Sequence, residues 1–389
     1  MSQFDERSVS VLGGGSWGTA LAHIVASHGY DTLLWVRREE QAEEINEQHT
    51  NSRYLKGGVL DPKVKATTDL ERVARSSEVI IHVVPSKAFR QVSYQLGDFL
   101  SGDQIIISAT KGLEGDGLTR MSQVLFEETC VRKIGALSGP NLAKEVIAGH
   151  PSATVVASPF SEVIEKAERL LAGPTFRLYG NADMVGVEMA GALKNIYAIA
   201  GGIAAGLGYG ANTLSALITR GLAEISRLGE HFGAERLTFQ GLAGVGDLVA
   251  TCTSTLSRNH TVGRHLAQGE DLAEIVANLG MVAEGVNTTR VVHAFAQAQG
   301  IDMPIARAVH GVLFESMTPA ESLGELMRRA SRYEGHDQPI QSQTLIGQSV
   351  TEAAALVARR GVGHVGRGGR GREHGRVGAL LLDVLVQVP

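Results

Sequence analysis

A glycine-rich turn near the N-terminus constrains this fold more than any other feature of the sequence. Residues 9–12 form a short β-rich run, the segment Gly-Gly-Gly-Ser-Trp-Gly follows directly, and residues 17–27 then have helical spacing of apolar side chains. In this G-x-G-x-x-G pattern Gly13 permits a tight turn, Gly15 leaves space for a pyrophosphate, and Gly18 lets the helix pack close to the strand. Because the first N–H groups of a helix are unpaired, the turn predicts a dinucleotide phosphate site, with a plain turn as the alternative.

Further apolar runs recur through the first half of the chain and alternate with helical stretches. Runs that are apolar on both faces are typical of the buried strands of a parallel sheet. Their alternation with helices predicts a doubly wound, Rossmann-like α/β domain over residues 1–182, with its ligand crevice at the carboxyl ends of the strands. The runs are residues 32–36, 79–84, 104–108, 134–137 and 153–156.

The chain changes character near residue 183. Residues 185–228 and 272–329 have helical patterns without strand-length β-branched runs, which predicts an all-helical second domain over residues 183–334. Within it, residues 196–218 carry no formal charge and are long enough to span a bilayer. Their glycines and polar side chains favour a buried pair of small-residue helices over a membrane span. Helix faces of this kind could also mediate a homodimer, which the sequence does not decide.

Residues 335–389 form a third region. Their Arg/Gly run at residues 359–372 cannot bury enough apolar area to order itself, so a disordered or weakly docked tail is expected. An RGG-like nucleic-acid contact and translation in a non-native frame are the alternatives.

Composition narrows the classes of function. The 389 residues carry 36 basic and 41 acidic side chains, a net charge of −5 that argues against a nucleic-acid partner. Cys130 and Cys252 lie far apart and form neither a zinc motif nor a disulfide framework, so no metal site is expected and a reducing compartment fits. The polar, acidic N-terminus is unlike a signal peptide, and we therefore expect a cytoplasmic protein.

The choice of dinucleotide depends on the end of the second strand. Residues 32–36 lead directly into Arg37 and Arg38, and the acids Glu39 and Glu40 come only afterwards. Guanidinium groups at this point suit a ribose 2′-phosphate, whereas a carboxylate would suit the free 2′-hydroxyl. We therefore expect NADP(H) to be preferred over NAD(H); a solvated strand end that admits both cofactors is the alternative.

Two lysines and one aspartate are the candidates for proton transfer. Lys111 follows a buried strand directly, and Lys194 lies in an otherwise uncharged helical region. A buried ammonium must find a partner or lower its pKa, which makes Lys194 the candidate general acid and base; a lysine reaching the domain surface is the alternative. Asp247 ends a glycine-rich turn, where it can hold a lysine ammonium, cap a helix, or do both.

Two further segments offer groups for an anion or a polar substrate. Ser257, Arg258 and Asn259 stand at a predicted helix start, where a hydroxyl, a guanidinium and an amide suit a phosphate; an ordinary capped helix with a solvated arginine is the alternative. Gly139 and Asn141 follow another predicted strand and offer backbone N–H groups.

Seven short segments that occur in order, at similar spacing, resemble the bacterial NAD(P)-dependent glycerol-3-phosphate dehydrogenase family. The resemblance extends from about residue 8 to about residue 334. The segments are residues 13–20, 109–112, 138–140, 193–195, 244–248, 257–259 and 282–285.

The resemblance implies reversible reduction of dihydroxyacetone phosphate to sn-glycerol 3-phosphate, which supplies phospholipid synthesis. It implies that Lys194 donates and accepts the proton, with Lys111 and Asp247 beside it. The residues implied to contact the cofactor are Ser16, Trp17, Arg37 with its neighbour Arg38, Lys111, Ala143, Arg258, Val282 and Glu284. Those implied to contact the substrate are Lys111, Gly139, Asn141, Lys194, Asp247, Ser257, Arg258 and Asn259.

The chain departs from the family pattern in two places. Asn141 stands where the family often has Ser or Thr, although an amide can also form hydrogen bonds, and the segment after Glu334 has no counterpart. A related enzyme acting on another ketone or hydroxy acid is one alternative function. A catalytically inactive NADP-binding sensor, whose Arg/Gly tail recruits nucleic acid, is another, and the intact set of Lys111, Lys194 and Asp247 argues against it.

Overall fold

The computed structural model describes residues 4–5, 7–279 and 283–330, and one compact unit covers residues 1–327. Two predictions, the tail at residues 335–389 and the cofactor contact Val282, lie outside the described residues.

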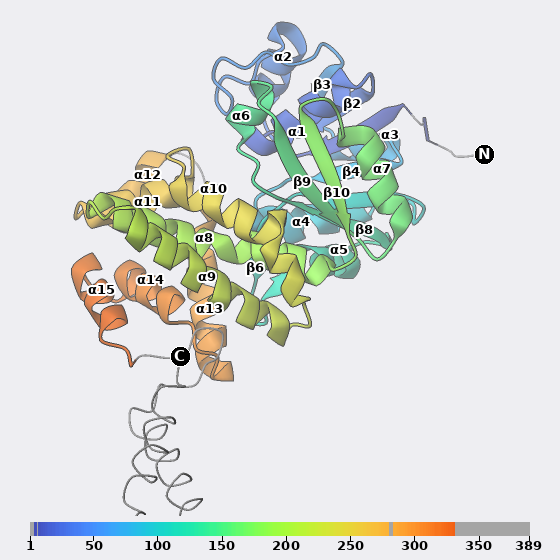
Figure 1. The fold of residues 1–389 in the computed structure, drawn as a ribbon. Coiled ribbons are helices and arrows are strands. Elements are labelled where there is room, and N and C mark those ends of the chain that lie inside the picture. Colours follow the sequence, from blue (N-terminus) through green and yellow to red (C-terminus); the bar gives the residue numbers. More distant parts are fainter. Residues whose placement is uncertain (1–3, 6, 280–282, 331–389) are drawn as a thin grey trace, which may run out of the picture. The chain divides into compact units, whose positions relative to one another are not determined.

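An eight-stranded, mostly parallel sheet forms the centre of the first half of the chain (Figure 1). Its strands are β1 (Ser8–Leu12), β2 (Asp31–Trp35), β3 (Val64–Thr67), β4 (Val79–His82), β5 (Ile105–Ser108), β8 (Lys133–Ser138), β9 (Ser152–Ala157) and β10 (Phe176–Asn181). They follow the order β10-β9-β8-β5-β4-β1-β2-β3, and β9 pairs antiparallel with β8 while the other neighbours are parallel. A separate antiparallel pair consists of β6 (Leu113–Glu114) and β7 (Thr119–Arg120).

The predicted α/β fold is confirmed, with a difference at one end of the sheet. The pattern predicts a parallel strand at residues 153–156, and this direction is wrong for β9 against β8. Val155 and Val156 are buried, and burial on both faces, rather than strand direction, is what makes a strand continuously apolar. The sequence pattern also missed β3 and β10; β10 lies at the sheet edge, and Tyr179 in it is exposed.

Helices cover both faces of this sheet (Figure 1). Successive side chains of a strand point to opposite faces, so in β5 Ile105 and Ile107 pack into one apolar cluster and Ile106 packs into another. The first cluster is completed by α1 (Ser16–Ser27), α2 (Glu39–Gln48), α6 (Ala143–Ile147) and α7 (Ser161–Leu171). The second is completed by α3 (Leu70–Ser76), α4 (Ser86–Gly97) and α5 (Met121–Glu128).

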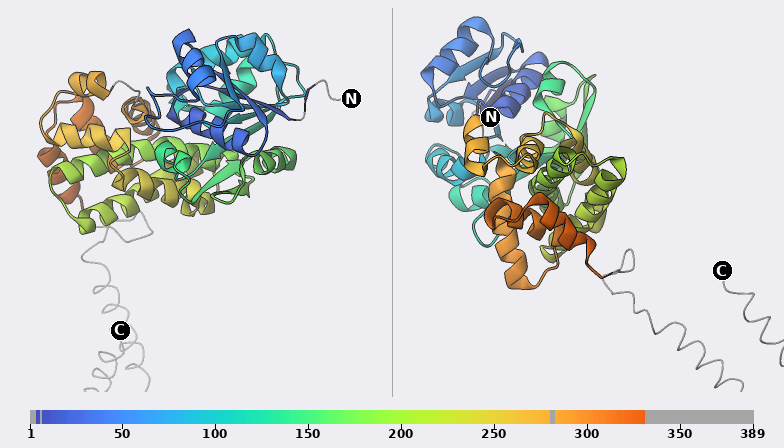
Figure 2. Two further views of the ribbon diagram at one scale, coloured as in Figure 1. Left: turned by 90° about the horizontal axis from the view of Figure 1, so that it is seen from above. Right: turned by 90° about the vertical axis from the view of Figure 1, so that its left-hand side faces the viewer.

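A second group of helices is assembled around one long buried helix, α8 (Met184–Gly206), which is seen from two further directions in Figure 2. An ideal Cβ on Gly263 would lie 1.9 Å from the carbonyl oxygen of Ile199, and one on Gly202 would lie 2.0 Å from that of His260. Glycine is therefore required where α8 and α11 touch. The remaining elements are α9 (Ala211–His231), η1 (Arg236–Gln240), η2 (Leu242–Gly246), α10 (Asp247–Thr253), α11 (Arg258–Ala267), α12 (Leu272–Leu279), α13 (Glu284–Gln299), α14 (Pro304–Phe314) and α15 (Pro319–Met327).

The uncharged stretch at residues 196–218 belongs to α8 and α9, as the helix-pair prediction requires. Burial is confirmed for α8, whereas the first half of α9 is exposed or half-buried. Within the described ranges, no helix is long and apolar enough to cross a membrane. The change from mixed to helical structure falls between β10 and α8, where Asp183 accepts a hydrogen bond from the Gly186 N–H. The predicted boundaries at residues 182/183 and 334/335 stay predictions.

Candidate active site

The glycine-rich turn has the geometry that its sequence predicts. Gly13 has a φ of +115°, and a Cβ on it would lie 2.7 Å from the carbonyl oxygen of Val83. A Cβ on Gly18 would lie 2.0 Å from the carbonyl oxygen of Gly13, so this turn tolerates no side chain at either position. No side chain caps α1 at Gly15, and the backbone N–H groups that begin at Ser16 are the donors that a pyrophosphate needs.

Two buried polar residues hold this turn through hydrogen bonds, and the sequence did not reveal either of them. Gln41 Nε2 and Asn51 Nδ2 donate hydrogen bonds to the Gly14 carbonyl oxygen over 2.6 Å and 3.0 Å. Asn51 Nδ2 also donates to Thr19 Oγ1 over 2.8 Å. No local motif marks Gln41 or Asn51, because tertiary packing alone brings them to the turn.

The predicted cofactor contacts near α1 lie around the same turn. The Ser16 hydroxyl donates to the Tyr54 carbonyl oxygen over 2.8 Å, and Trp17 is half-buried with its ring 6.4 Å from that of Phe176. Ala143 begins α6, which packs against α1. These positions place all three predicted residues beside the helix that would hold the phosphates.

The two arginines predicted to choose the cofactor follow β2, next to β1 in the sheet. Arg37 is exposed, and Arg38 is the N-cap residue of α2. Carboxylates begin with Glu39, which accepts a hydrogen bond from Thr68 Oγ1. The end of β2 therefore presents guanidinium groups before any carboxylate, as the sequence order indicates.

Both predicted lysines converge on one buried carboxylate. Lys111 Nζ lies 2.6 Å from Asp247 Oδ2, and Lys194 Nζ lies 2.9 Å from Asp247 Oδ1. Lys111 Nζ also donates to the Gly139 carbonyl oxygen over 3.0 Å. Because Asp247 is 2% exposed, its charge is screened little, and it acts on both ammonium groups. The alternative in which Lys194 reaches the surface is wrong, since this residue is 6% exposed.

Thr251 completes the surroundings of Lys194 and was missed by the sequence reasoning. Lys194 Nζ donates to Thr251 Oγ1 over 2.6 Å, and the threonine hydroxyl donates to the Asp247 carbonyl oxygen, also over 2.6 Å. The spacing of four residues between Asp247 and Thr251 was the available signal, since it places both on one face of α10. The helix-cap alternative for Asp247 is not realised: Gly246 is the N-cap of α10, and Asp247 is the first helical residue.

Burial tunes the proton affinity of Lys194. The pKa of its ammonium is lowered from 10.5 to about 8, because desolvation and the positive charge of Lys111 outweigh the opposing effect of Asp247. A pKa of about 8 lets the same group donate and accept a proton near neutral pH.

The predicted anion site lies at the start of α11. Ser257 is the N-cap residue, and its hydroxyl accepts a hydrogen bond from the His260 N–H over 3.3 Å. Arg258 is exposed, yet partial desolvation of its guanidinium lowers its pKa, and the negative charge of Glu284 opposes this shift. The predicted helix start is therefore present, with Ser257 as its cap and Arg258 as its first helical residue, and the anion role of this segment stays a prediction.

Asn259 serves partly as a bridge inside the protein. Its Nδ2 donates to Asn195 Oδ1 over 3.0 Å, and its Oδ1 accepts from the Gly285 N–H over 3.0 Å. The amide therefore joins α8, next to Lys194, to the start of α13 and keeps one N–H for a ligand.

Polar groups after β8 line the same region. Gly139 has a φ of +148°, and its carbonyl oxygen holds Lys111. Asn141 Nδ2 donates to the Ala153 carbonyl oxygen over 2.9 Å, whereas its buried Oδ1 has no hydrogen-bond partner within the described ranges. An unsatisfied buried acceptor is costly, so Asn141 Oδ1 is suited to a substrate hydroxyl.

Glu284 connects α13 to the first half of the chain. The Ser86 N–H donates to Glu284 Oε1 over 3.1 Å, and the Ser86 hydroxyl donates to Glu284 Oε2. Ser86 begins α4, directly beyond β4, so a residue predicted to contact the cofactor also reaches the carboxyl edge of the sheet.

Comparisons with known proteins agree with this geometry. Residues 8–164 match the family model described as NAD-dependent glycerol-3-phosphate dehydrogenase N-terminus, and residues 183–324 match its C-terminus. Curated relatives named glycerol-3-phosphate dehydrogenase (NAD(P)+) include one from Teredinibacter turnerae, 46% identical over 83% of this chain and 95% of that protein. Another, from Azotobacter vinelandii, is 48% identical over 82% of this chain and 94% of that protein.

Solved structures extend the likeness to three dimensions. The crystal structure of glycerol-3-phosphate dehydrogenase from Coxiella burnetii has a TM-score of 0.80 and 40% identity, covering 83% of this chain and 99% of that one. These matches span both halves of the described chain. The chain therefore belongs to the NAD-dependent glycerol-3-phosphate dehydrogenase family.

Proposed function

We propose that this chain catalyses the reversible reduction of dihydroxyacetone phosphate to sn-glycerol 3-phosphate with NAD(P)H. The observation that carries the proposal is the buried Asp247 carboxylate, which holds two lysine ammonium groups beyond a sheet that also bears a dinucleotide turn. The relatives are named glycerol-3-phosphate dehydrogenase (NAD(P)+). The glycine turn also suits such a cofactor, because Gly13 and Gly18 leave no room for a side chain and keep the turn tight.

In this mechanism the nicotinamide supplies the hydride, and the chain supplies the proton and the orientation. Lys194 Nζ, an ammonium before the step, gives its proton to the developing alkoxide and remains as an amine. Thr251 and Asp247 hold that nitrogen in place, and Lys111 stabilises the same negative charge. General-acid assistance of this kind is worth roughly 10²–10⁴-fold in rate.

The substrate phosphate would bind at the start of α11. Arg258 supplies charge, Ser257 presents its hydroxyl at the helix cap, and Asn259 offers its remaining N–H. Binding energy from this remote group orients the ketone at Lys194. Gly139 and Asn141 would contact the hydroxyl end of the substrate.

The cofactor would lie over the turn with Ser16, Trp17 and Ala143 around it. Arg37, with Arg38 beside it, would bind the 2′-phosphate and make NADPH the preferred reductant. Glu284 and Arg258 would lie at the opposite side of the cofactor, with Val282, two residues before Glu284 in the sequence, also in contact.

We further infer a cytoplasmic enzyme that supplies phospholipid synthesis, built as a cofactor domain over residues 1–182 and a substrate domain over residues 183–334. The exposed small residues at the start of α9 offer a face for a homodimer.

The decisive experiment follows nicotinamide absorbance while the purified chain is mixed with dihydroxyacetone phosphate and NADPH. Parallel reactions contain NADH, or unphosphorylated dihydroxyacetone. We expect oxidation of both cofactors, faster with NADPH, and little reaction without the phosphate. Cofactor binding without oxidation would favour another substrate or the inactive-sensor alternative, and equal rates without the phosphate would remove the anion-site assignment.

A further inference from the structure

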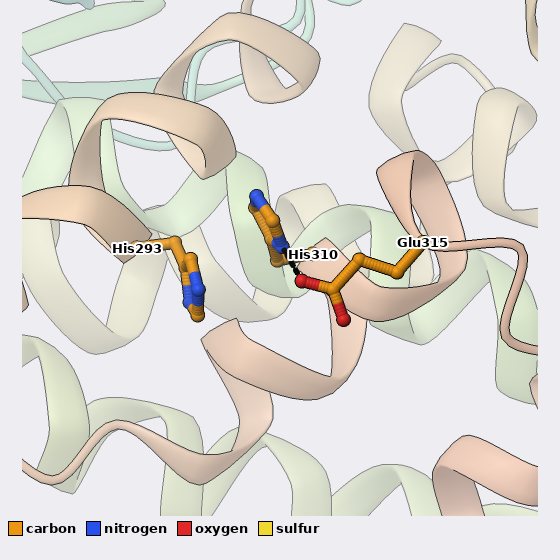
Figure 3. A group of neighbouring side chains, drawn as sticks. All are labelled: His293, His310 and Glu315. Atoms are coloured by element: carbon orange, nitrogen blue, oxygen red, sulfur yellow. Dashed lines mark ion pairs between the residues drawn. The ribbon is translucent and has the colours of Figure 1, made fainter. Parts of the chain in front are cut away.

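Three side chains of the helical part, none of which the proposed mechanism uses, lie together (Figure 3). His293 belongs to α13, His310 belongs to α14, and Glu315 follows directly where α14 ends. Their potential ligand atoms all lie within 4.8 Å of one another. The group escapes sequence motifs because its two histidines belong to different helices.

The contacts inside the group leave a buried nitrogen unsatisfied. The rings of His293 and His310 are stacked, with centroids 3.9 Å apart and planes inclined by 19°. Glu315 Oε1 lies 3.0 Å from His310 Nδ1, yet this buried nitrogen has no partner in hydrogen-bond geometry among the described residues. A buried ring nitrogen without a hydrogen bond is costly, which indicates a further partner.

The donor set identifies the chemistry of that partner. Two imidazoles and one carboxylate suit divalent transition metals, and Zn²⁺ binds such sets with water in the fourth position. Bond lengths of about 2.0–2.2 Å place neighbouring ligand atoms about 3.3 Å apart in a tetrahedral site. The observed 3.0 Å contact already has this spacing, and atoms at the 4.8 Å limit would approach by about 1.5 Å through side-chain rotations.

The surroundings permit entry of an ion and limit its affinity. The Glu315 side chain is 55% exposed, whereas that of His310 is 15% exposed, so the carboxylate faces solvent and the imidazole faces the protein. The Phe314 ring packs against His310 with centroids 5.0 Å apart, and the Arg290 guanidinium lies over the Phe314 ring, 4.7 Å from its centroid. The positive charge of Arg307 also acts on His293. Because this positive charge opposes the binding of a further cation, we expect micromolar rather than nanomolar affinity.

We propose that His293, His310 and Glu315 form a binding site for one divalent transition-metal ion, of which Zn²⁺ is the best match. The ion would join α13 to the end of α14. Since α13 begins at Glu284, which accepts hydrogen bonds from Ser86, an ion here braces the helix that presents Glu284.

The test uses the full chain without an affinity tag, freed of metal by a chelator and then titrated with Zn²⁺ in a calorimeter. We expect one ion per chain and a higher melting temperature in its presence. Co²⁺ in place of Zn²⁺ should give the visible absorbance of a four-coordinate site. In Glu315→Gln and His293→Gln, affinity should fall at least about tenfold, because one of three protein ligands is lost.

A matched control and the contrary outcomes complete the design. His265 lies 2.5 Å from Glu270, and among the residues that the structure describes no third ligand joins this pair, so His265→Gln should bind Zn²⁺ like the unaltered chain. Glu315→Gln changes an exposed side chain and should keep the fold, which circular dichroism checks. Absence of saturable binding up to about 1 mM Zn²⁺ overturns the proposal. The proposal is also overturned if Glu315→Gln and His293→Gln bind Zn²⁺ with the same affinity as the unaltered chain, because the ion would then bind elsewhere.

Discussion

Replacing Asp247 by Asn removes the charge that holds both lysines while keeping the shape of the side chain. At 2.9 Å, the attraction between Asp247 and the Lys194 ammonium is about 6 kcal/mol for an effective dielectric constant of 20. The asparagine oxygen retains part of it, so the net effect should be that of a nearby opposite charge, about 1–3 pKa units. The ammonium is stabilised by the carboxylate, and its pKa of about 8 therefore falls to about 5–7 in Asp247→Asn.

The assay is kcat/KM for dihydroxyacetone phosphate reduction measured against pH. Reduction needs the ammonium form of Lys194, so the rate declines as pH rises through its pKa, and this decline should move to lower pH in the variant. At pH 7.5 about three quarters of Lys194 is protonated when its pKa is about 8. In the variant this fraction is about one quarter for a pKa of about 7 and well under 1% for a pKa of about 5, so the rate should fall about 3- to 200-fold. Lowering the pH should recover part of the activity.

A second buried ion pair supplies the control. Arg120 and Glu188 lie 2.7 Å apart, with 14% and 7% of their side chains exposed. Breaking either pair by removing one partner should cost about 3–5 kcal/mol of unfolding free energy, so Glu188→Gln should lower the melting temperature like Asp247→Asn. It should leave the pH of the rate decline unchanged. A decline that stays at its original pH in Asp247→Asn would refute the assignment of that titration to Lys194.

Four further substitutions test other parts of the site. Thr251→Val keeps the side-chain volume but removes the hydrogen-bond acceptor for Lys194. We expect kcat to fall about tenfold while NADPH affinity, measured by fluorescence titration, stays unchanged. An unaltered kcat would show that the hydroxyl is dispensable. Arg258→Ala should raise KM for dihydroxyacetone phosphate about 10- to 100-fold, the worth of a charged hydrogen bond, and a change confined to kcat would contradict its phosphate role. Gly18→Ala forces a Cβ to 2.0 Å from the Gly13 carbonyl oxygen and should abolish NADPH binding or lower the melting temperature; unaffected binding and stability would show that the turn yields. Arg37→Ser should reduce the NADPH-to-NADH ratio of kcat/KM about tenfold, whereas an unchanged ratio would assign the preference to other residues.

Local sequence patterns predicted the elements better than their pairing. The apolar runs correctly located six strands, because a buried strand must be apolar wherever it lies in a sheet. They did not reveal the reversed direction of β9, since burial constrains composition and not direction. The edge strand β10 has one buried residue, Phe176, and lacks the continuous apolar run that marked these six strands.

The predicted site residues divide in a similar way. Lys194 could be selected because an isolated charge in an apolar helix demands a partner, and the structure supplies Asp247. The sequence could not single out Thr251, Gln41 and Asn51, because hydroxyl and amide side chains are common and their importance depends on what they contact. Asn259 looked like a pure ligand group, yet its amide is largely engaged by Asn195 and Gly285.

The sequence by itself determined the glycine turn, the alternation of strands and helices, and the chemical groups available for reaction. These depend on backbone conformation and on neighbours within a few residues. The tertiary structure decided which groups meet: Lys111 and Asp247 are separated by 136 residues along the chain but lie 2.6 Å apart. It likewise brought together His293 and His310 from two helices. Such contacts arise from packing among distant elements, whose buried surface offsets the entropy of closing long loops, and no local pattern encodes them.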